Sequence, residues 1–385
     1  MATIMDYMDW RGDLTLKQDP FNDIDGLILS CLSYVDFEGI VPGIGKGEIS
    51  LEDAGRLFFE RHTAEELDKD RSFIRFAPYL LRKMAGTARF KNSKLRNYVN
   101  RIDLAIELQF AAIEIVTDDG VSFISYRGTD DTIVGWKEDF NLSFRNVPAE
   151  EHATDYLEEI SSDSFAGIRL GGHSKGGHLA IYAASGVSSG IASRILKIYD
   201  YDGPGFNKET FESEQFKFLS GRIVKYVPES SIIGRLLYNS TEPVVVKSSE
   251  FGIMQHNPVT WQVKGREYIT CPCNDKMSDL FDETMTGWIE SMDNVERRLF
   301  VDDIFAVFEA SGCGYLSQLG RAGLKGRKGM LDRLNLMSAE SQEKVRTLGR
   351  IFFSNWGDML QAKEAMAHSR IRFKIGKTRK SKDPL

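Results

Sequence analysis

The sequence contains few cysteines and prolines, and it has no long apolar run. Only 4 cysteines and 10 prolines occur among 385 residues. So few cysteines exclude a fold stapled by disulfides. Cys271-Pro272-Cys273 has the wrong spacing for half of a tetrahedral metal site, and it lacks a nearby histidine or second cysteine pair. No stretch approaches about eighteen uninterrupted apolar residues, which argues against a membrane-spanning helix.

Basic charge is also scarce, because 49 lysines and arginines stand against 56 acidic residues and give a net charge of -7. This balance argues against a general nucleic-acid binder, which needs a basic surface to displace counterions from phosphates. The segment Met1 to Asp23 lacks the basic start and apolar run of a signal peptide, so we expect a cytoplasmic protein. The basic end, Arg370 to Lys382, is interpreted as a solvated tail.

The hydrophobic content of 42% is enough to bury a large core. Apolar residues at helical spacing predict a buried helix within Phe21 to Phe37, and a second helical region is expected from Leu51 to Val99. We therefore predict a helical N-terminal flank, residues 1–100, packed on the core. Helical patterns return at Val295 to Phe308 and Ser338 to Gln361. They predict a helical C-terminal appendage, residues 276–385.

Between these flanks, residues 101–275 predict an α/β core. Two β-rich runs, residues 109–116 and 121–126, are joined by Asp119-Gly120, a strong hairpin signal. Extended and helical patterns then alternate: helical at 156–160, extended at 167–170, helical at 179–184, and extended at 195–199, 223–227 and 244–247. Such alternation is typical of a mostly parallel sheet covered by helices on both faces.

The segment Gly172-His173-Ser174-Lys175-Gly176 matches the Gly-x-Ser-x-Gly turn that presents a nucleophilic serine. A short strand precedes it and a helix follows it, which is the setting that this turn requires. The alternative is a glycine-rich turn in which Ser174 only caps the helix. A phosphate-binding loop does not fit, because Lys175 is misplaced for that role. The N–H groups at the start of the helix, including that of Lys175, would suit a developing oxyanion.

Upstream, the strand ending at Tyr126 runs into Arg127-Gly128-Thr129, followed by Trp136 and Asp139. With the serine motif, this order resembles class 3 lipases. The resemblance implies that Thr129 supplies oxyanion donors and that Asp139 orients the Thr129 hydroxyl. An oxyanion hole needs two hydrogen-bond donors that are in position before negative charge develops on the substrate oxygen.

The span from Asp6 to Val263 also resembles the bacterial Mbeg1-like family, formerly a domain of unknown function. The segments that carry this resemblance are Pro20-Phe-Asn-Asp-Ile-Asp25, Gly172-His-Ser-Lys-Gly-Gly177, Asp202-Gly-Pro-Gly-Phe206 and Gln255-His256. The family is placed among lipase-like α/β hydrolases. The resemblance therefore implies an α/β-hydrolase fold and a hydrolase chemistry, but no substrate.

A neutral serine needs a histidine base with a carboxylate behind it. The chain order of such folds leaves His178, His256 and His368 as candidates, and His256 stands in a loop at the expected place, between apparent strands that include Val259 to Val263. For the acid, Asp202 follows the strand after the serine helix and resembles the acid position of pancreatic-type lipases. Glu229 follows the next strand, where class 3 lipases place an Asp, and stays the alternative.

These residues predict a serine hydrolase that cleaves an acyl ester, with a small-molecule ester or lipid as substrate and no cofactor. A thioesterase or phospholipase would use the same triad, because the triad does not distinguish acyl leaving groups. A third alternative is an inactive hydrolase fold that serves as a binding or regulatory module. Peripheral membrane contact and the oligomeric state are left open, as is a lid role for the helical flanks.

Overall fold

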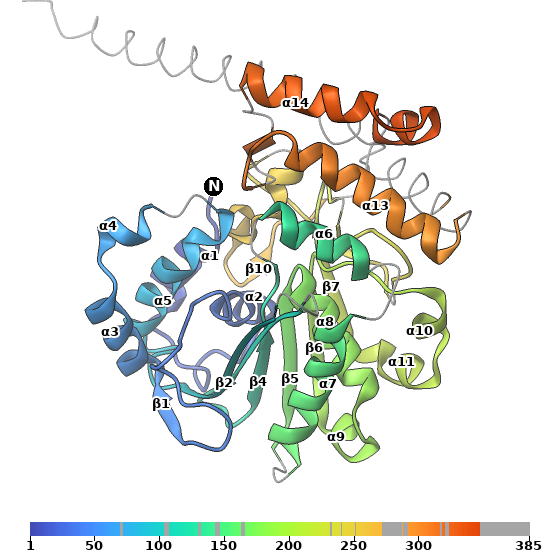
Figure 1. Ribbon diagram of the computed structural model, residues 1–385. Coiled ribbons are helices and arrows are strands. Elements are labelled where there is room, and N and C mark those ends of the chain that lie inside the picture. Colours follow the sequence, from blue (N-terminus) through green and yellow to red (C-terminus); the bar gives the residue numbers. More distant parts are fainter. Residues whose placement is uncertain are drawn as a thin grey trace, which may run out of the picture.

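The computed structural model describes most of the chain from residue 1 to residue 346. The described residues are 1–69, 72–103, 108–129, 132–142, 147–162, 166–231, 233–239, 241–250, 252–271, 287, 292–315, 318–319 and 323–346. Their centre is a single large sheet, whose strands follow one another in chain order across the molecule (Figure 1). The strands are β1 (Glu48–Ser50), β2 (Lys94–Asp103), β3 (Leu108–Val116), β4 (Ser122–Tyr126), β5 (Ile168–His173), β6 (Ile195–Tyr201), β7 (Ile223–Pro228) and β8 (Val244–Val246).

The sheet has an antiparallel part and a parallel part that meet at β4. Strands β1 to β4 pair antiparallel, whereas β4 to β8 pair parallel, each with the next. Because parallel strands need crossover connections, helices separate β4 from β5, β5 from β6, and β6 from β7. The loops after β4, β5, β6 and β7 therefore leave the sheet at one edge, where the candidate residues stand.

Helices cover both faces of the sheet. On one face, α2 (Asp23–Leu32) packs against β4, β5 and β6, and the other N-terminal helices pack around it. On the opposite face, α7 (Pro148–Ser161) and α8 (Lys175–Gly186) pack against the strands. The other helices of these two layers are α1 (Ile4–Arg11), α3 (Leu51–Arg61), α4 (Ala64–Leu67), α5 (Ala77–Ala85), α9 (Ser189–Arg194), α10 (Lys208–Glu212) and α11 (Glu214–Leu219).

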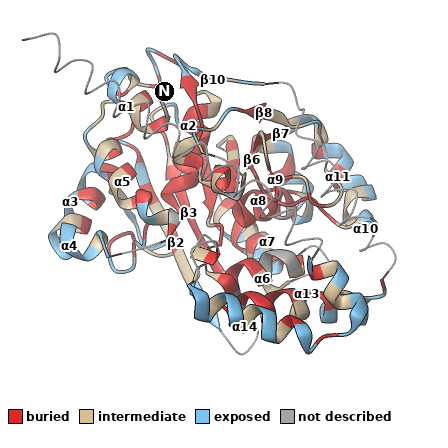
Figure 2. Ribbon diagram, turned by 90° about the horizontal axis from the view of Figure 1, so that it is seen from above, coloured by how far each residue is buried: buried red, intermediate tan, exposed pale blue. Residues whose placement is uncertain are grey.

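Alternation along the strands divides the core between these two layers. In β4, Phe123 belongs to the cluster beneath α2, whereas Ile124 faces the cluster beneath α8. In β6, Tyr199 and Ile198 divide in the same way. Figure 2 shows the buried residues concentrated along the strands and the helices that touch them. Both faces of the sheet are therefore covered, as its mostly apolar strands require.

A third apolar cluster lies outside the two layers and joins the C-terminal helices to the edge of the sheet where the loops gather. Helix α6 (Ile133–Leu142), α13 (Asn294–Glu309) and α14 (Leu324–Asn335) contribute to it. In Figure 1, α13 lies over α6 and α14 lies over α13. A backbone hydrogen bond from Ile133 N–H to the Gly314 carbonyl also ties α6 to the C-terminal segment, at 3.1 Å.

The predicted α/β-hydrolase fold is confirmed: a mostly parallel sheet is flanked by helices. The hairpin is β3–β4, with Gly120 in the left-handed region at φ 78°. The expected helical stretch from Leu51 to Val99 is wrong at its end, because Lys94 begins strand β2. Arg96 in that strand pairs with the buried Glu114 of β3 at 2.9 Å, so its charge is that of a cross-strand partner.

The expected strand at Val259 to Val263 is also largely wrong, because residues 258–260 form a 3₁₀ turn and β9 (Val263–Lys264) is a short strand paired with β10 (Glu267–Tyr268). Among the described residues, no helix is long and apolar enough to cross a membrane. Cys273, the basic tail from Arg370 and the expected helix beyond residue 346 lie outside the described residues. The three-part division at residues 100 and 275 stays a prediction.

Candidate active site

Ser174 stands in a sharp turn between β5 and α8. Its φ of 58° lies in the left-handed region, which costs a residue other than glycine about 1–3 kcal/mol. The flanking glycines make this turn sterically feasible. A Cβ on Gly172 would lie 2.1 Å from the carbonyl carbon of Gly176, and a Cβ on Gly176 would lie 2.1 Å from the Tyr126 carbonyl oxygen. Both positions therefore require glycine, and Ser174 is held above the end of the sheet.

His256 approaches this serine from a 3₁₀ turn at Gly252–His256. Its Nε2 lies 2.9 Å from Ser174 Oγ, and its Nδ1 lies 2.7 Å from Asp202 Oδ2. Because a carboxylate only accepts, Nδ1 carries the proton and donates to Asp202, which leaves Nε2 to accept the Ser174 hydroxyl. Ser174 is 3% exposed and His256 is 4% exposed, so this chain of hydrogen bonds is shielded from water.

Asp202 follows directly after β6, and its backbone is also left-handed, with φ 58°. The structure brings this carboxylate to His256 and does not bring Glu229 there. Glu229 stands half-buried after β7. The neighbouring Ser231 occupies the region where the resemblance to class 3 lipases led us to weigh an acid, and its hydroxyl donates to Asp202 Oδ1. Both oxygens of Asp202 are thus engaged.

A buried ion pair supports the turn that carries Asp202, and the sequence analysis did not foresee it. Lys225 of β7 lies 2.5 Å from Asp200 of β6, and both side chains are buried. Lys225 also donates to the Gly203 carbonyl, while Asp200 accepts from the Gly203 N–H at 2.8 Å. Burial raises the pKa of the Asp200 carboxyl, and the Lys225 ammonium opposes this rise. The turn is therefore clamped on both sides of Gly203.

Thr129 and Lys175 flank the serine. Strands β4 and β5 pair so that Tyr126 stands opposite Gly172, which places the segment after β4 beside Ser174. A Cβ on Gly128 would lie 3.1 Å from Ser174 Cβ. The next residue, Thr129, is buried. Lys175 begins α8, and its buried side chain donates to the Gln109 carbonyl at 3.1 Å.

The remaining predicted residues fall into two groups. Asp139 belongs to α6, but its side chain lies outside the described residues, as does His368. His178 is buried away from the serine, where its Nε2 lies 2.8 Å from the Glu150 carboxylate and its ring stacks on Phe206. These contacts support the structural role expected for His178.

Two aromatic rings lie against His256, from residues that the sequence motifs contain but to which sequence reasoning assigned no role. The Trp136 ring of α6 has its centroid 5.3 Å from that of His256, and the ring of His173 lies at 4.5 Å. His173 stands directly before Ser174, at a position where the Gly-x-Ser-x-Gly motif allows any residue, so the motif could not predict a role for it. Among the described residues, no group of three or more His, Cys, Asp or Glu side chains could hold a metal ion.

The sequence model of one protein family matches this chain over residues 84–306, which is more than half of its length. The chain belongs to the Mbeg1-like family. In this Mbeg1-like protein, the matched span includes Ser174, His256 and Asp202 and reaches into α13. It therefore begins later and ends later than the resemblance at Asp6 to Val263 suggested. None of the proteins with curated functions matches the chain.

Two solved lipase structures are distantly similar to this Mbeg1-like protein. M37 lipase is 16% identical with a TM-score of 0.35, over 56% of this chain and 70% of that chain. The lipase of Rhizomucor miehei, solved as a propeptide complex, is 16% identical with a TM-score of 0.33, over 54% of this chain and 68% of that one.

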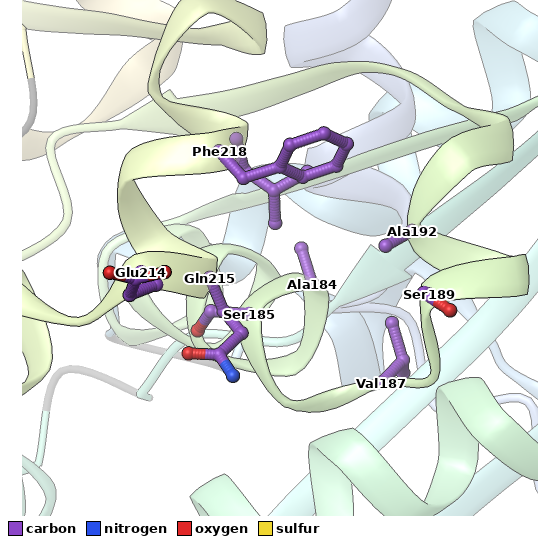
Figure 3. A pocket seen from close by; sticks show the side chains of 9 residues that line it. Ala184, Ser185, Val187, Ser189, Ala192, Glu214, Gln215 and Phe218 are labelled. Carbon is purple, nitrogen blue, oxygen red and sulfur yellow. The ribbon is translucent and has the colours of Figure 1, made fainter.

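A surface pocket of about 390 Å³ lies beside the end of α8, between α9 and α11 (Figure 3). Its lining residues are Ala184, Ser185, Val187, Ser189, Ala192, Glu214, Gln215, Phe218 and Leu219. Neither Ser174 nor its partners are among them. The pocket is therefore separate from the candidate active site.

Proposed function

We propose that this protein is a serine hydrolase that cleaves acyl esters through Ser174, His256 and Asp202. The observation that carries the proposal is the continuous hydrogen-bonded path from the serine hydroxyl through both ring nitrogens to the carboxylate, at 2.9 Å and 2.7 Å. Each residue has the role for which its chemistry fits it: a nucleophile, a base within reach, and an acid that orients the base.

In the first step, Ser174 Oγ attacks the carbonyl carbon of the ester while His256 Nε2 takes the hydroxyl proton. The imidazolium that forms is stabilised by the buried Asp202 carboxylate, which keeps its own charge. When the tetrahedral intermediate collapses, the carbon–oxygen bond to the alcohol breaks, and His256 returns its proton to the departing alkoxide. An acyl group then remains on Ser174.

In the second step, water attacks this acyl-enzyme, and His256 accepts a proton from the water. Collapse of the second intermediate releases the carboxylic acid, and His256 returns the proton to Ser174 Oγ. No atom other than those of the ester, water and the three side chains is consumed or left over. The protein thus needs no oxidant or reductant for the proposed reaction.

For the oxyanion, we propose the backbone N–H of Lys175 and the N–H and hydroxyl of Thr129. The first position belongs to the start of α8, where the helix dipole favours negative charge. The second follows the glycine whose missing side chain lets this segment approach Ser174. Removal of one such donor typically costs about 3 kcal/mol of transition-state stabilisation. We propose Asp139 as the residue that orients the Thr129 hydroxyl.

The test is labelling of the full chain with a small fluorophosphonate, comparing the wild type with Ser174→Ala. A small probe is appropriate because Ser174 is only 3% exposed. We expect labelling and p-nitrophenyl acetate hydrolysis in the wild type, and loss of both in Ser174→Ala. Ser185→Ala is the matched control, since it removes a serine from the same helix α8 and should label normally.

A folded wild type that neither labels nor hydrolyses the ester would contradict the proposal and favour the inactive binding module. Among the active alternatives, a matched series of p-nitrophenyl esters, thioesters and phospholipids separates an esterase from a thioesterase or phospholipase. The substrate class with the highest kcat/KM would identify which of these three activities the protein has.

A further inference from the structure

His173 contacts the proposed base, His256, without taking part in the hydrogen bond to Asp202. It is fully buried, and its Nε2 lies 2.7 Å from the backbone carbonyl oxygen of His256. Its Nδ1 lies 2.8 Å from the hydroxyl of Tyr34, which follows α2. The residue next to the nucleophile thus touches the base through the base's own backbone.

These partners determine which nitrogen of His173 carries the proton. A carbonyl oxygen only accepts, so Nε2–H must donate to His256. Nδ1 then has a lone pair and accepts the Tyr34 hydroxyl, which can also turn toward the His173 carbonyl at 3.3 Å. A Cβ on Gly128 would lie 2.3 Å from the Tyr34 hydroxyl. The missing side chain at Gly128 is therefore needed to accommodate Tyr34.

Neutrality of this second imidazole matters, because the base becomes positively charged during each turnover. Burial, and then the neighbouring His256, hold the pKa of His173 well below its ordinary value of 6.5. A neutral ring 4.5 Å from the base adds no repulsion when the base takes the serine proton. A charged side chain at the same position would oppose that step.

The backbone carbonyl of the preceding residue, Gln255, also accepts a hydrogen bond from a buried ring. Trp261 Nε1–H donates to the Gln255 carbonyl at 2.8 Å, so two buried rings hold two consecutive carbonyls of the base loop. Of these two bonds, the one from His173 links the loop to the residue next to Ser174. This bond therefore joins the loop that carries His256 to the turn that carries Ser174 through a rigid ring.

We propose that His173 is a positioning residue for the reaction: its Nε2–H fixes the base against the nucleophile, and Tyr34 fixes the His173 tautomer. This inference rests on the proposed function, because it assigns a role within the same site. It does not make His173 a catalytic residue, since it touches neither the reacting hydroxyl nor the acid.

Three variants test it. His173→Phe keeps a ring but removes both nitrogens, and we expect kcat to fall about tenfold to hundredfold with KM unchanged, since small misplacements are costly. His173→Gln can donate to His256 and accept from Tyr34, and it should keep kcat within about threefold of the wild type. Tyr34→Phe should lower kcat, but add little when His173 is already Phe.

A folded His173→Phe with wild-type kcat would overturn the proposal, and so would equal losses in His173→Phe and His173→Gln. If His173→Phe fails to fold, Tyr34→Phe decides: an unchanged kcat overturns the proposal and a lowered kcat supports it.

A wild type without activity would instead contradict the proposed function. In that case the positioning role is tested without any reaction, by measuring the solvent exchange of the His256 Nδ1–H proton from its low-field NMR signal. Faster exchange of this proton in His173→Phe, or in Tyr34→Phe where the former does not fold, supports the positioning role, and unchanged exchange overturns it.

Discussion

The turns at Ser174 and Asp202 share a geometry but are held in different ways. Both residues have a φ of 58°, and both follow parallel strands that are neighbours in the sheet. The Ser174 N–H donates to the Tyr201 carbonyl at 2.9 Å, and the Asp202 N–H donates to the Tyr226 carbonyl at 2.8 Å. Each turn is therefore hydrogen-bonded to the next strand of the sheet.

The difference lies in what surrounds each backbone. The serine turn depends on missing side chains, because Gly172 and Gly176 pack directly on backbone atoms. The acid turn also needs a glycine, since a Cβ at Gly203 would lie 2.7 Å from the Ser174 carbonyl oxygen, but it is held in addition by the buried pair Asp200–Lys225. A turn made of glycines leaves a pattern in the local sequence, whereas an ion pair from two strands leaves none. This is why the nucleophile was easier to predict than the acid.

The largest effect should come from the acid itself. We expect Asp202→Asn to lower kcat about 10⁴-fold, because the amide cannot favour the required His256 tautomer. Glu229→Gln is the matched control, and its kcat should stay within about twofold, since the structure does not bring Glu229 to His256 and Glu229 stands outside the proposed triad. Steady-state kinetics on p-nitrophenyl acetate measures both. A larger loss of kcat in Glu229→Gln than in Asp202→Asn would mean that the turn at Asp202 is not part of the site.

The clamp beneath the acid turn should matter next. Lys225→Met leaves Asp200 buried without its cation and should destabilise the fold by about 3–5 kcal/mol. Adding Asp200→Asn removes the unpaired charge and should restore part of that loss. Urea unfolding of the wild type and the two variants measures the difference. No destabilisation in Lys225→Met would show that the turn does not depend on the pair.

For the serine turn, we expect Gly176→Ala to cost at least about 3 kcal/mol, because the new methyl group meets backbone that cannot move aside. Gly190→Ala is its control, since a Cβ at Gly190 in α9 meets nothing within 4 Å. That substitution should be neutral or stabilise by up to about 1 kcal/mol. Thermal unfolding distinguishes them, and equal effects would contradict the role of close packing.

The smallest expected effect concerns pH. Folded His173 has a lowered pKa, so between its folded pKa and 6.5 the unfolded chain binds a proton that the folded protein does not. The wild type should therefore lose stability as pH falls below 6.5, by up to about 1.4 kcal/mol per pH unit. His173→Gln lacks this titration, so its urea midpoint should fall less from pH 7 to pH 5.5. Parallel losses would show that folded His173 takes up the proton.

Local patterns predicted most of the fold. Asp119-Gly120 identified the β3–β4 hairpin, and the alternation after it identified the parallel strands. The error at Leu51 to Val99 arose because β2 is a mixed-polarity strand, whose charges pair across the sheet. The salt bridge from Arg96 to Glu114 is a contact between separate strands, so no local window could reveal it.

The sequence by itself determined the turn at Ser174, because steric exclusion between nearby residues demands glycine at fixed spacing around it. It also limited the candidates for the proposed base to three histidines. The tertiary structure alone decided which acid faces His256, that Ser231 holds the acid's second oxygen, and that His173 contacts the base. These choices depend on hydrogen bonds between residues up to 83 positions apart, whose directions are set only when the strands pair.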